Sequence, residues 1–577
     1  MRKEAIITLS LAAALCCSCN LTLIPEDTVS PESYFKTASD FELWTNAFYT
    51  QFSSADDLAG LNADDVIDNN AQDCIKDSRS AATETWSWTQ LRNINYMLQN
   101  ASQCTDAAVR ERWCGVAYFF RAYFYFVKVR RYGDVPWYTE PIGSSETDLL
   151  EKARDDRGYV MYQVMKDFDR AIASLPATKD VSQVNKWTAL AFKSRAALYE
   201  GTFRKYHGIG DIDIDEMGIG ADWFLRQAAD AAEQLMSGAQ YKLATGDDIY
   251  RTMFVDEDAN TDEYILARVY GDILAHDVRH NSVGEKQAFT RRFMNHYQLR
   301  SGKSITTRSG YETEGFAAEV KDRDPRLAQT VYCGTSTVLG DTPEYMNGVT
   351  GYQPIKYESI KTKNSSGKGT FDFPLMRLPE VYLNFAEAKA ELGTLTQADL
   401  DKSVNLIRAR VGMPSLNMQS ANSEPDALMM EYYPNVTKSA NTGVILEIRR
   451  ERTIELVMEG NRQWDMFRWK EGAQMVNHDN PYLGVYFPGT GTYDFSGNGK
   501  YDVEIYQGSR TSSVSVFRQL GSDIYLTDGT RGRVIAYPNV DYTWNEDRDY
   551  LWPIPATQRV LNHNLKQNPG WADGLSY

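Results

Sequence analysis

Two glutamates one helical turn apart, Glu455 and Glu459, have the residue type and spacing of a catalytic carboxylate pair. A general acid and a general base of this kind could cleave a glycosidic bond. The pair stands in a run of charges from Glu451 to Arg468, and charged helical faces of this kind usually form ion pairs. We therefore interpret the two glutamates as structural. The ion pairs predicted at a spacing of three residues are Arg452–Glu455, Glu459–Arg462, Arg462–Asp465 and Asp465–Arg468.

His276 and His280 are four residues apart and could share a metal ion if their segment were helical. No glutamate adjoins them as in the HExxH motif of zinc enzymes. The sequence also has no GxSxG nucleophile elbow and no glycine-rich phosphate loop. We predict neither a zinc site nor a catalytic centre.

A second segment matches a metal-binding motif more closely. Asp494, Ser496, Asn498 and Asp502 place oxygen side chains at positions 1, 3, 5 and 9 of a calcium-type loop, and Gly499 stands at its turn. The bidentate glutamate expected at position 12 is missing. Two interpretations remain open, a weak structural calcium site and plain Asx-type turns. No motif requires any other cofactor.

The long segment Asp56–Ser87, together with Trp88, combines planar polar groups with aromatic rings. Sugars stack their C–H faces on aromatic rings, and their hydroxyls bind carboxylates, amides and guanidinium groups. The two tryptophans have an alternative interpretation, which is packing against the first helix pair. The candidate ligand-binding residues are Asp65, Asp68, Asn69, Arg79, Trp86 and Trp88.

The elements that must position these residues are mostly helices. Leu446–Lys470 has an apolar row at spacings of three and four, which predicts one buried stripe that Gly460 either ends or kinks. The nearly continuous apolar run from Gly115 to Val129 predicts a buried helix that Gly133 stops. Further helices are predicted over Asp40–Phe52, Thr89–Gln103, Arg157–Ser174, Lys186–Tyr199, Trp223–Ser237, Arg377–Leu392 and Gln397–Val411.

Strands are predicted to be few and short. Glu263–Gly271 alternates as a short strand does, and Pro481–Tyr550 is rich in Gly, Asp and Tyr without helical period. The predicted fold class is therefore mainly α, with a loop-rich region that contains short strands.

The first residues predict export. A basic head and an apolar run, Ala5–Leu15, form a signal peptide over residues 1–18, and the run is too short to span a bilayer. Cys19 follows a small residue and precedes a polar tether, as a lipidated cysteine does; Cys17 and a cleaved signal without lipid are the alternatives. The mature protein is expected to be anchored to a membrane through its lipid.

The composition argues against some classes of function. The chain of 577 residues is 42% hydrophobic, which is enough for a large folded core, and its formal charge of −17 argues against binding nucleic acid. The remaining cysteines show neither a disulfide framework nor a zinc motif, so no disulfide is predicted. These cysteines are Cys74, Cys104, Cys114 and Cys333.

The charged run reads ER-x-x-EL-x-x-EG-x-R-x-x-D-x-x-RW from Glu451 to Trp469. With four further motifs it resembles the SusD/RagB family of outer-membrane nutrient-binding lipoproteins over nearly the whole mature chain. The further motifs are RAY-x-YF followed by YGDVP (Arg121–Pro136), DRDPRL (Asp322–Leu327), LWPIP (Leu551–Pro555) and QNPGW (Gln567–Trp571).

The resemblance implies a SusD-like fold in which tetratricopeptide-type helix pairs form the scaffold. It implies a tether over 19–39, an N-terminal helical region over 40–240 and a C-terminal region over 241–577. It also implies a cell-surface lipoprotein of the outer membrane that binds a glycan, performs no chemistry and delivers the glycan to a SusC-like TonB-dependent transporter. A peptide ligand is the alternative, and a glycoside hydrolase has no positive feature in the sequence. In the middle segment, where relatives contribute aromatic contacts, this chain offers Tyr270, Phe289 and Tyr297.

Overall fold

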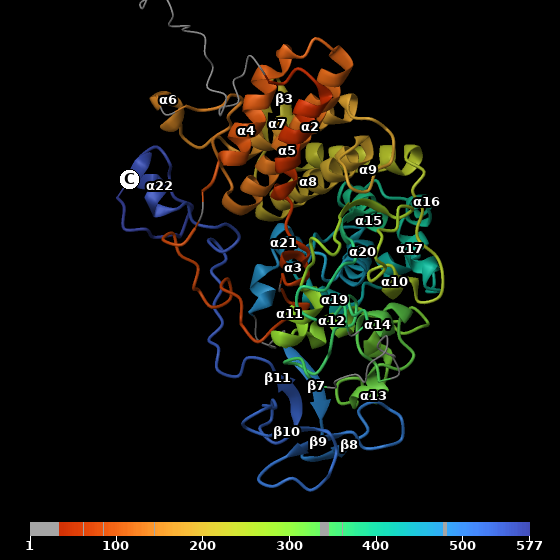
Figure 1. The fold of residues 1–577 in the computed structure, drawn as a ribbon. Helices are drawn as coiled ribbons and strands as arrows, with labels where there is room; N and C mark the ends of the chain where they lie inside the picture. The colour runs from red at the N-terminus through yellow and green to blue at the C-terminus, as the bar shows by residue number, and fades with distance from the viewer. Residues whose placement is uncertain are drawn as a thin grey trace, which may run out of the picture.

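The computed structural model describes residues 34–576 except 62, 85, 144, 335–345, 361 and 477–481. Within these residues the chain is mainly helical, and its short strands form sheets of two or three strands (Figure 1). The predicted signal peptide and Cys19 lie outside the described residues. No helix in the described ranges is both long and apolar enough to cross a membrane.

Helix α5 (Ala107–Tyr132) is buried along most of its length. The Asp106 carboxylate accepts two backbone N–H groups at its start, and Gly133, with φ of +73°, ends it. The guanidinium of Arg121 on this helix binds the Asp167 carboxylate on α7 (Arg157–Ser174) at 2.6 and 2.9 Å. The prediction of a buried helix that Gly133 stops is confirmed.

The long helices pack as successive neighbours, as the predicted helix pairs require. Helix α5 contacts α4 (Thr89–Asn100) and α7, and α8 (Lys186–His207) contacts α7 and α9 (Ala221–Gly238). Helix α15 (Leu378–Glu391) then contacts α9 and α20 (Thr442–Glu455). A Cβ at Gly201 on α8 would lie 2.8 Å from Leu225 on α9, so these two helices approach closely only because residue 201 is glycine.

The charged signature forms two helices, α20 (Thr442–Glu455) and α21 (Arg462–Arg468), and not one continuous stripe. The chain between them turns through two residues of positive φ, Met458 at +59° and Gly460 at +75°. Of the two predicted outcomes at Gly460, the helix therefore ends. The predicted helix Gln397–Val411 is likewise divided, into α16 (Gln397–Asp401) and α17 (Val404–Arg410).

Apart from one hairpin beside α7 and α9, the strands lie in two places. β1 (Val66–Ile67) pairs with β5 (Ala288–Phe289), and β4 (Tyr264–Arg268) pairs with β6 (Phe373–Arg377), both within the helical body. The strands β7 to β11 form a group that we call the β lobe, at the end of the molecule opposite α2 (Ala38–Asn46), α4 and α5 (Figure 1). The β lobe comprises β7 (Leu483–Phe487), β8 (Gly491–Tyr493), β9 (Val503–Tyr506), β10 (Val516–Gln519) and β11 (Gly532–Ile535), with β7 paired to β11 and β9 between β8 and β10.

Shorter elements complete the fold. The Asp56–Ser87 segment, predicted as a loop, begins inside α3 (Ala55–Ala59) and contains β1. The remaining helices and strands are α2 (Ala38–Asn46), η1 (Ala47–Gln51), η2 (Ala101–Gln103), α6 (Thr147–Leu150), β2 (Ile212–Ile214), β3 (Met217–Ile219), α10 (Ile249–Thr252), α11 (Val278–Gly284), α12 (Arg291–His296), η3 (Ile305–Thr307), α13 (Phe316–Glu319), α14 (Pro325–Thr330), α18 (Met418–Ser423), α19 (Ala427–Tyr432), η4 (Gly472–Met475) and α22 (Ala556–Leu561).

Candidate ligand-binding cleft

The carboxylates that could have formed a catalytic pair are locked in a buried charge network around α20. Glu455 binds Arg377 at 2.7 Å and Arg410 at 2.5 Å, and all three side chains are almost completely buried. Burial opposes ionisation of Glu455, but the surrounding arginines overcome it and hold the pKa of its carboxyl far below the usual range. Glu459 binds Arg377 at 2.8 Å and Lys356 at 2.7 Å.

The predicted local ion pairs are mostly wrong. Of the four, only Asp465–Arg468 forms, at 2.9 Å. Arg452 binds Asp465, while Arg462 reaches Asp64 near the start of the chain. Because α20 and α21 are buried on all sides, their charges find partners on neighbouring elements and not along one exposed helical face.

The histidines do not share a site. His276 precedes α11 and is buried between the rings of Tyr270 and Phe371, whereas His280 lies on α11 and is exposed. Burial lowers the pKa of His276 to about 4, so its ring is neutral at pH 7.

The acidic residues of the predicted calcium loop bind backbone N–H groups. Asp494 accepts from Asn498 and Gly499, and Asp502 accepts from Phe495 and Ser496. These contacts are those of Asx-type turns. No cluster of three or more metal-binding side chains occurs among the residues that the structure describes.

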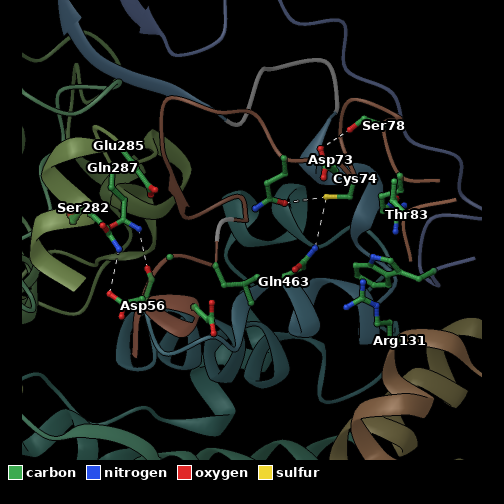
Figure 2. Close-up of a pocket in the computed structure, with 18 of the residues that line it drawn as sticks. Asp56, Asp73, Cys74, Ser78, Thr83, Arg131, Ser282, Glu285, Gln287 and Gln463 are labelled. Carbon is green, nitrogen blue, oxygen red and sulfur yellow. Dashed lines mark hydrogen bonds between the residues drawn. The ribbon is translucent and has the colours of Figure 1, made fainter. Parts of the chain in front are cut away.

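A cavity of about 660 Å³, here called the polar cleft, opens between α3, α11 and the segment that follows β1 (Figure 2). Its volume is that of a small-molecule site. Its lining is rich in groups that donate or accept hydrogen bonds. These groups belong to Asp56, Asp57, Gln72, Asp73, Ser78, Arg79, Thr83, Glu84, Arg131, Asn281, Ser282, Glu285, Gln287 and Gln463.

One wall of the polar cleft is acidic. The Asp56 carboxylate, near the start of α3, accepts the backbone N–H of Asp277 at 2.8 Å. Burial, together with the charge of Asp277, raises the pKa of Asp56. Glu285 is largely exposed, and its partial burial together with the charges of Asp68 and Asp56 raises the pKa of its carboxyl. It lies across from Asp73 in Figure 2. This wall offers acceptors that are short of positive partners.

The opposite wall is basic. Arg131 binds Glu84 at 2.5 Å and is two-fifths exposed. Arg79 is held more tightly, since its guanidinium binds Asp549 at 2.8 Å and lies 4.9 Å from the ring centroid of Trp552. Arg131 covers the same ring at 5.2 Å. Trp552 therefore supports the two arginines and does not present an open face to the cleft.

Amide and thiol groups connect the two walls (Figure 2). The thiol of Cys74 donates to the side-chain oxygen of Gln72 at 3.1 Å, and the Gln463 amide donates to the Cys74 sulfur at 3.8 Å. Burial raises the pKa of Cys74 to about 11, so the thiol stays protonated and is a poor nucleophile. The Gln287 amide donates to the carbonyl of Ala59 at 2.9 Å.

The charged signature holds the cleft segment in place. Arg462 on α21 binds both carboxylate oxygens of Asp64, at 2.6 and 2.7 Å, and Asp64 stands two residues before β1. Burial opposes the charge of Asp64, but Arg462 overcomes it and lowers the pKa of Asp64. The neighbouring Asp65 has no such partner, and burial together with the Asp64 charge raises its pKa to about 7. The motif thus positions the candidate site without belonging to it.

The structure separates the predicted ligand-binding residues. Arg79 lines the polar cleft, and Asp68 and Asn69 lie beside it, because the Asn69 N–H donates to the carbonyl of Glu285 at 2.8 Å. Asp65 is buried. Tyr270 is half-buried, and its hydroxyl accepts the N–H of Ala55 at the start of α3.

The structure corrects the expectation that Phe289 and Tyr297 contact a ligand. Both are fully buried in the hydrophobic core, so neither presents a ring face to a ligand. Their aromatic type indicated a binding surface, but aromatic rings are also core residues, and only the fold distinguishes the two roles.

Trp86 and Trp88 line a different cavity of about 580 Å³, which we call the tryptophan groove, between α4, α6 and α22. Trp86 packs edge-to-face against Tyr132, and Trp88 packs against Tyr138. Both tryptophans are half-buried. The wall of the groove is predominantly apolar. The two tryptophans both line it and pack against the aromatic residues beneath them.

Sequence reasoning missed several lining residues. Asp56, Asn281 and Gln287 carry no motif, and only the fold brings α3 and α11 together. Trp552 stands in the LWPIP motif, which was the one available signal that the C-terminal region reaches the cleft.

Comparison with known proteins identifies the family. The family model described as "SusD family" matches residues 244–571, and a second, described as "Starch-binding associating with outer membrane", matches residues 37–198. SusD-like protein P38 of Formosa agariphila is 22% identical over 82% of this chain and 92% of its own length. SusD-like protein P2 of the same organism is 22% identical over 99% of this chain and 100% of its own length.

Solved structures agree in fold. A SusD-like protein from Bacteroides fragilis has a TM-score of 0.68 at 20% identity, with 95% of this chain and 100% of that chain covered. A second B. fragilis structure, described as a SusD-like carbohydrate binding protein, has a TM-score of 0.67 at 19% identity, with 92% and 99% covered. With its signature motifs, its paired helices and these matches together, the chain belongs to the SusD family.

Proposed function

We propose that this protein is an outer-membrane lipoprotein that binds a glycan in the polar cleft and delivers it to a SusC-like TonB-dependent transporter. Lipid on Cys19 would anchor it on the cell surface. The description of one matching family model as starch-binding and outer-membrane associated, and of one solved relative as carbohydrate binding, support this direction.

The observation that carries the proposal is the lining of the polar cleft. A sugar hydroxyl both donates and accepts a hydrogen bond, so a glycan needs acceptors and donors in reach of each other. The cleft supplies carboxylates on the α3–α11 wall and guanidinium and amide groups on the other. The cleft carries both negative and positive side chains, which suits a neutral polyhydroxyl ligand.

We propose no hydrolysis. The signature carboxylates that chemistry could have used are paired with arginine or lysine inside the scaffold, away from the cleft. A carboxylate whose pKa is held far below its usual range is a poor general acid at neutral pH.

A peptide is the second candidate, and the opposite charges of the two walls favour it. A free α-amino group would suit Asp56 and Glu285, and a carboxylate would suit Arg131. Neutral glycans contain neither group, so the two ligand classes can be separated by experiment.

The test is a binding screen with the full-length chain purified in detergent. Arrays of oligosaccharides from starch, xylan, mannan, laminarin and pectin would be probed beside an array of short peptides. We expect saturable binding to one glycan class and no release of reducing sugar from it. Binding to peptides alone would replace the glycan proposal with the peptide one, and release of reducing sugar would refute the non-catalytic role.

A further inference from the structure

A second cavity, of about 560 Å³, lies where the β lobe meets the helical body. Phe517, Arg518, Asp523 and Tyr525 of the β lobe line one side, and Asn347 lies on the other. None of the motifs identified in the sequence includes these residues, and the proposed glycan site in the polar cleft does not use them. We call this cavity the lobe cavity.

The lobe cavity shares a wall with the polar cleft. Glu285 and Gln287 line the cleft, while Lys286 between them lines the lobe cavity. Lys286 has φ of +54°, a backbone conformation that a residue with a side chain adopts only at some cost. The surrounding structure holds it there, since its carbonyl accepts the N–H of Val349 at 3.0 Å. One residue of backbone therefore separates the two cavities.

The segment after β1 runs along the same wall. The Asn69 N–H donates to the carbonyl of Glu285 at 2.8 Å, and the Tyr537 hydroxyl donates to the carbonyl of Asp68 at 2.8 Å. Tyr537 directly precedes Pro538, which lines the lobe cavity. Asn69 is exposed on this shared wall. Its side-chain oxygen accepts from the Asn70 amide at 2.9 Å, and its amide nitrogen is available from the outside to a chain that crosses from one cavity to the other.

The lobe cavity supplies what the polar cleft lacks, an accessible aromatic ring. In the cleft, Arg79 and Arg131 cover Trp552. In the lobe cavity, Phe517 is 37% exposed, although the Arg510 guanidinium lies 3.7 Å from its ring centroid. Arg510 supports the ring and leaves much of it open to the cavity, as a platform for the C–H face of a sugar requires.

Polar groups surround this ring. The Asn347 side chain makes no hydrogen bond with any residue that the structure describes, and it is half-buried at the cavity. The Asp523 carboxylate accepts the N–H of Gln519, which leaves acceptor capacity, and Arg518 is fixed by the carbonyl of Met346. A ring with an amide, a carboxylate and a guanidinium beside it is the chemistry that recognises a sugar unit.

We propose that the lobe cavity is a second sugar-binding subsite and that one glycan chain crosses the Glu285–Gln287 wall to occupy both cavities. This inference rests on the proposed glycan-binding function. It assigns the ligand to extended oligosaccharides, because a single sugar or a disaccharide fills only one cavity. Affinity should therefore rise with chain length until both cavities are filled.

The test compares Phe517→Ala and Asn347→Ala with the wild-type chain on the oligosaccharide arrays named above, which carry each glycan class from disaccharides upward. We expect Phe517→Ala to lose about tenfold or more of the affinity for long chains while keeping that for the shortest ones. Asn347→Ala should lose less, in the same length-dependent way. Phe517→Ala should lower the melting temperature only slightly, because its ring is partly packed against Arg510, and Asn347→Ala should leave it unchanged. The length dependence of the affinity loss separates a lost subsite from this small loss of stability.

Tyr501→Ala is the matched control, since Tyr501 is a 68% exposed aromatic residue of the β lobe that lines neither cavity. Wild-type binding at every chain length by both cavity variants would overturn the second subsite and leave the proposed function standing. An equal loss in Tyr501→Ala would also overturn it. If the wild-type chain binds no glycan of any class, the proposed function falls, and this inference falls with it.

Discussion

Two regions of this molecule concentrate charge, and they use it in opposite ways. In the network around α20, Glu455, Arg377 and Arg410 are almost completely buried, and each meets its partners at hydrogen-bond distance. In the polar cleft, Glu285 is exposed, and Arg131 is two-fifths exposed with one acidic partner. Charged side chains that are fully paired with one another hold the fold together. Charged side chains with unused hydrogen-bond donors or acceptors remain available for a ligand.

The comparison shows what a family signature marks here. The most recognisable residues of the chain build the scaffold, and one of them, Arg462, reaches out to fix Asp64 beside the cleft. Most residues that line the cleft belong to no motif, and Trp552 of the LWPIP motif is the exception that the sequence offered. Recognising the family and locating the ligand site are therefore separate problems in this protein.

The strongest test of the comparison is Glu455→Ala. This change leaves Arg326, Arg377 and Arg410 without a shared carboxylate inside the protein. We expect the free energy of unfolding to fall by about 3–5 kcal/mol, because uncompensated buried charge is costly. Urea unfolding at pH 7 measures it.

Glu233→Ala is the matched control, since the Glu233–Lys402 pair is about half exposed on both sides. It should cost at most about 1 kcal/mol. Equal effects of the two variants would mean that burial does not distinguish the network from an ordinary surface ion pair.

Trp86→Ala and Trp88→Ala test whether the tryptophan groove belongs with the scaffold or with the site. Both rings pack against aromatic neighbours of α5 and the segment after it, so each variant should lose about 2 kcal/mol of stability. Thermal melting and glycan affinity should be measured on the same samples. Lost affinity at unchanged melting temperature in either variant would transfer the ligand site from the polar cleft to the groove.

For the acidic residues of the polar cleft we expect the opposite result, which is lost affinity at unchanged stability. Glu285→Ala and Asp73→Ala should each weaken glycan binding about tenfold, or about 1.4 kcal/mol, without changing the melting temperature, because both side chains are exposed. Titration calorimetry with the best glycan from the screen measures the affinity. Asp222→Ala, which removes an exposed acid from α9, controls for net charge. A loss of the same size in this control would show that the cleft has no special role.

The final prediction concerns the pH dependence set by Asp65, whose pKa burial raises to about 7. A raised carboxyl pKa favours the protonated folded state, so this contribution is complete below the ordinary pKa of Asp and is lost as pH rises towards 7. Asp65→Asn should therefore gain about 3 °C in melting temperature over the wild type between pH 4 and pH 7. A difference that does not change with pH would contradict the pKa.

Much of the fold could be predicted from the sequence, because amphipathic period reports which face of a helix is buried. Helix α7 has the predicted bounds, and the glycine stop of α5 is confirmed. The i,i+3 ion pairs failed because that rule describes exposed faces, whereas α20 is buried on all sides. The turn between α20 and α21 uses a positive φ at Met458, which its residue type does not indicate.

The site was less predictable for a different reason. Residue types indicated that Arg79, Trp86 and Trp88 could bind sugars, but they do not indicate which cavity each side chain enters. Asp56 and Gln287, more than two hundred residues apart, meet only in the folded chain. Cavities formed by distant segments leave no pattern within a single stretch of sequence.

The bond between Asp64 and Arg462 joins residues 398 positions apart, and this separation constrains the order in which the protein can mature. While the chain is being made, the segment beside the cleft exists long before the arginine that fixes it. Contacts of such long range form late and slow the folding of a domain. Until synthesis has delivered α21, the N-terminal helices must remain soluble with their cleft unformed, which is when chaperones would be needed most. A chain that is cut short before residue 462 would carry most of the predicted ligand-binding residues and still lack the group that holds them.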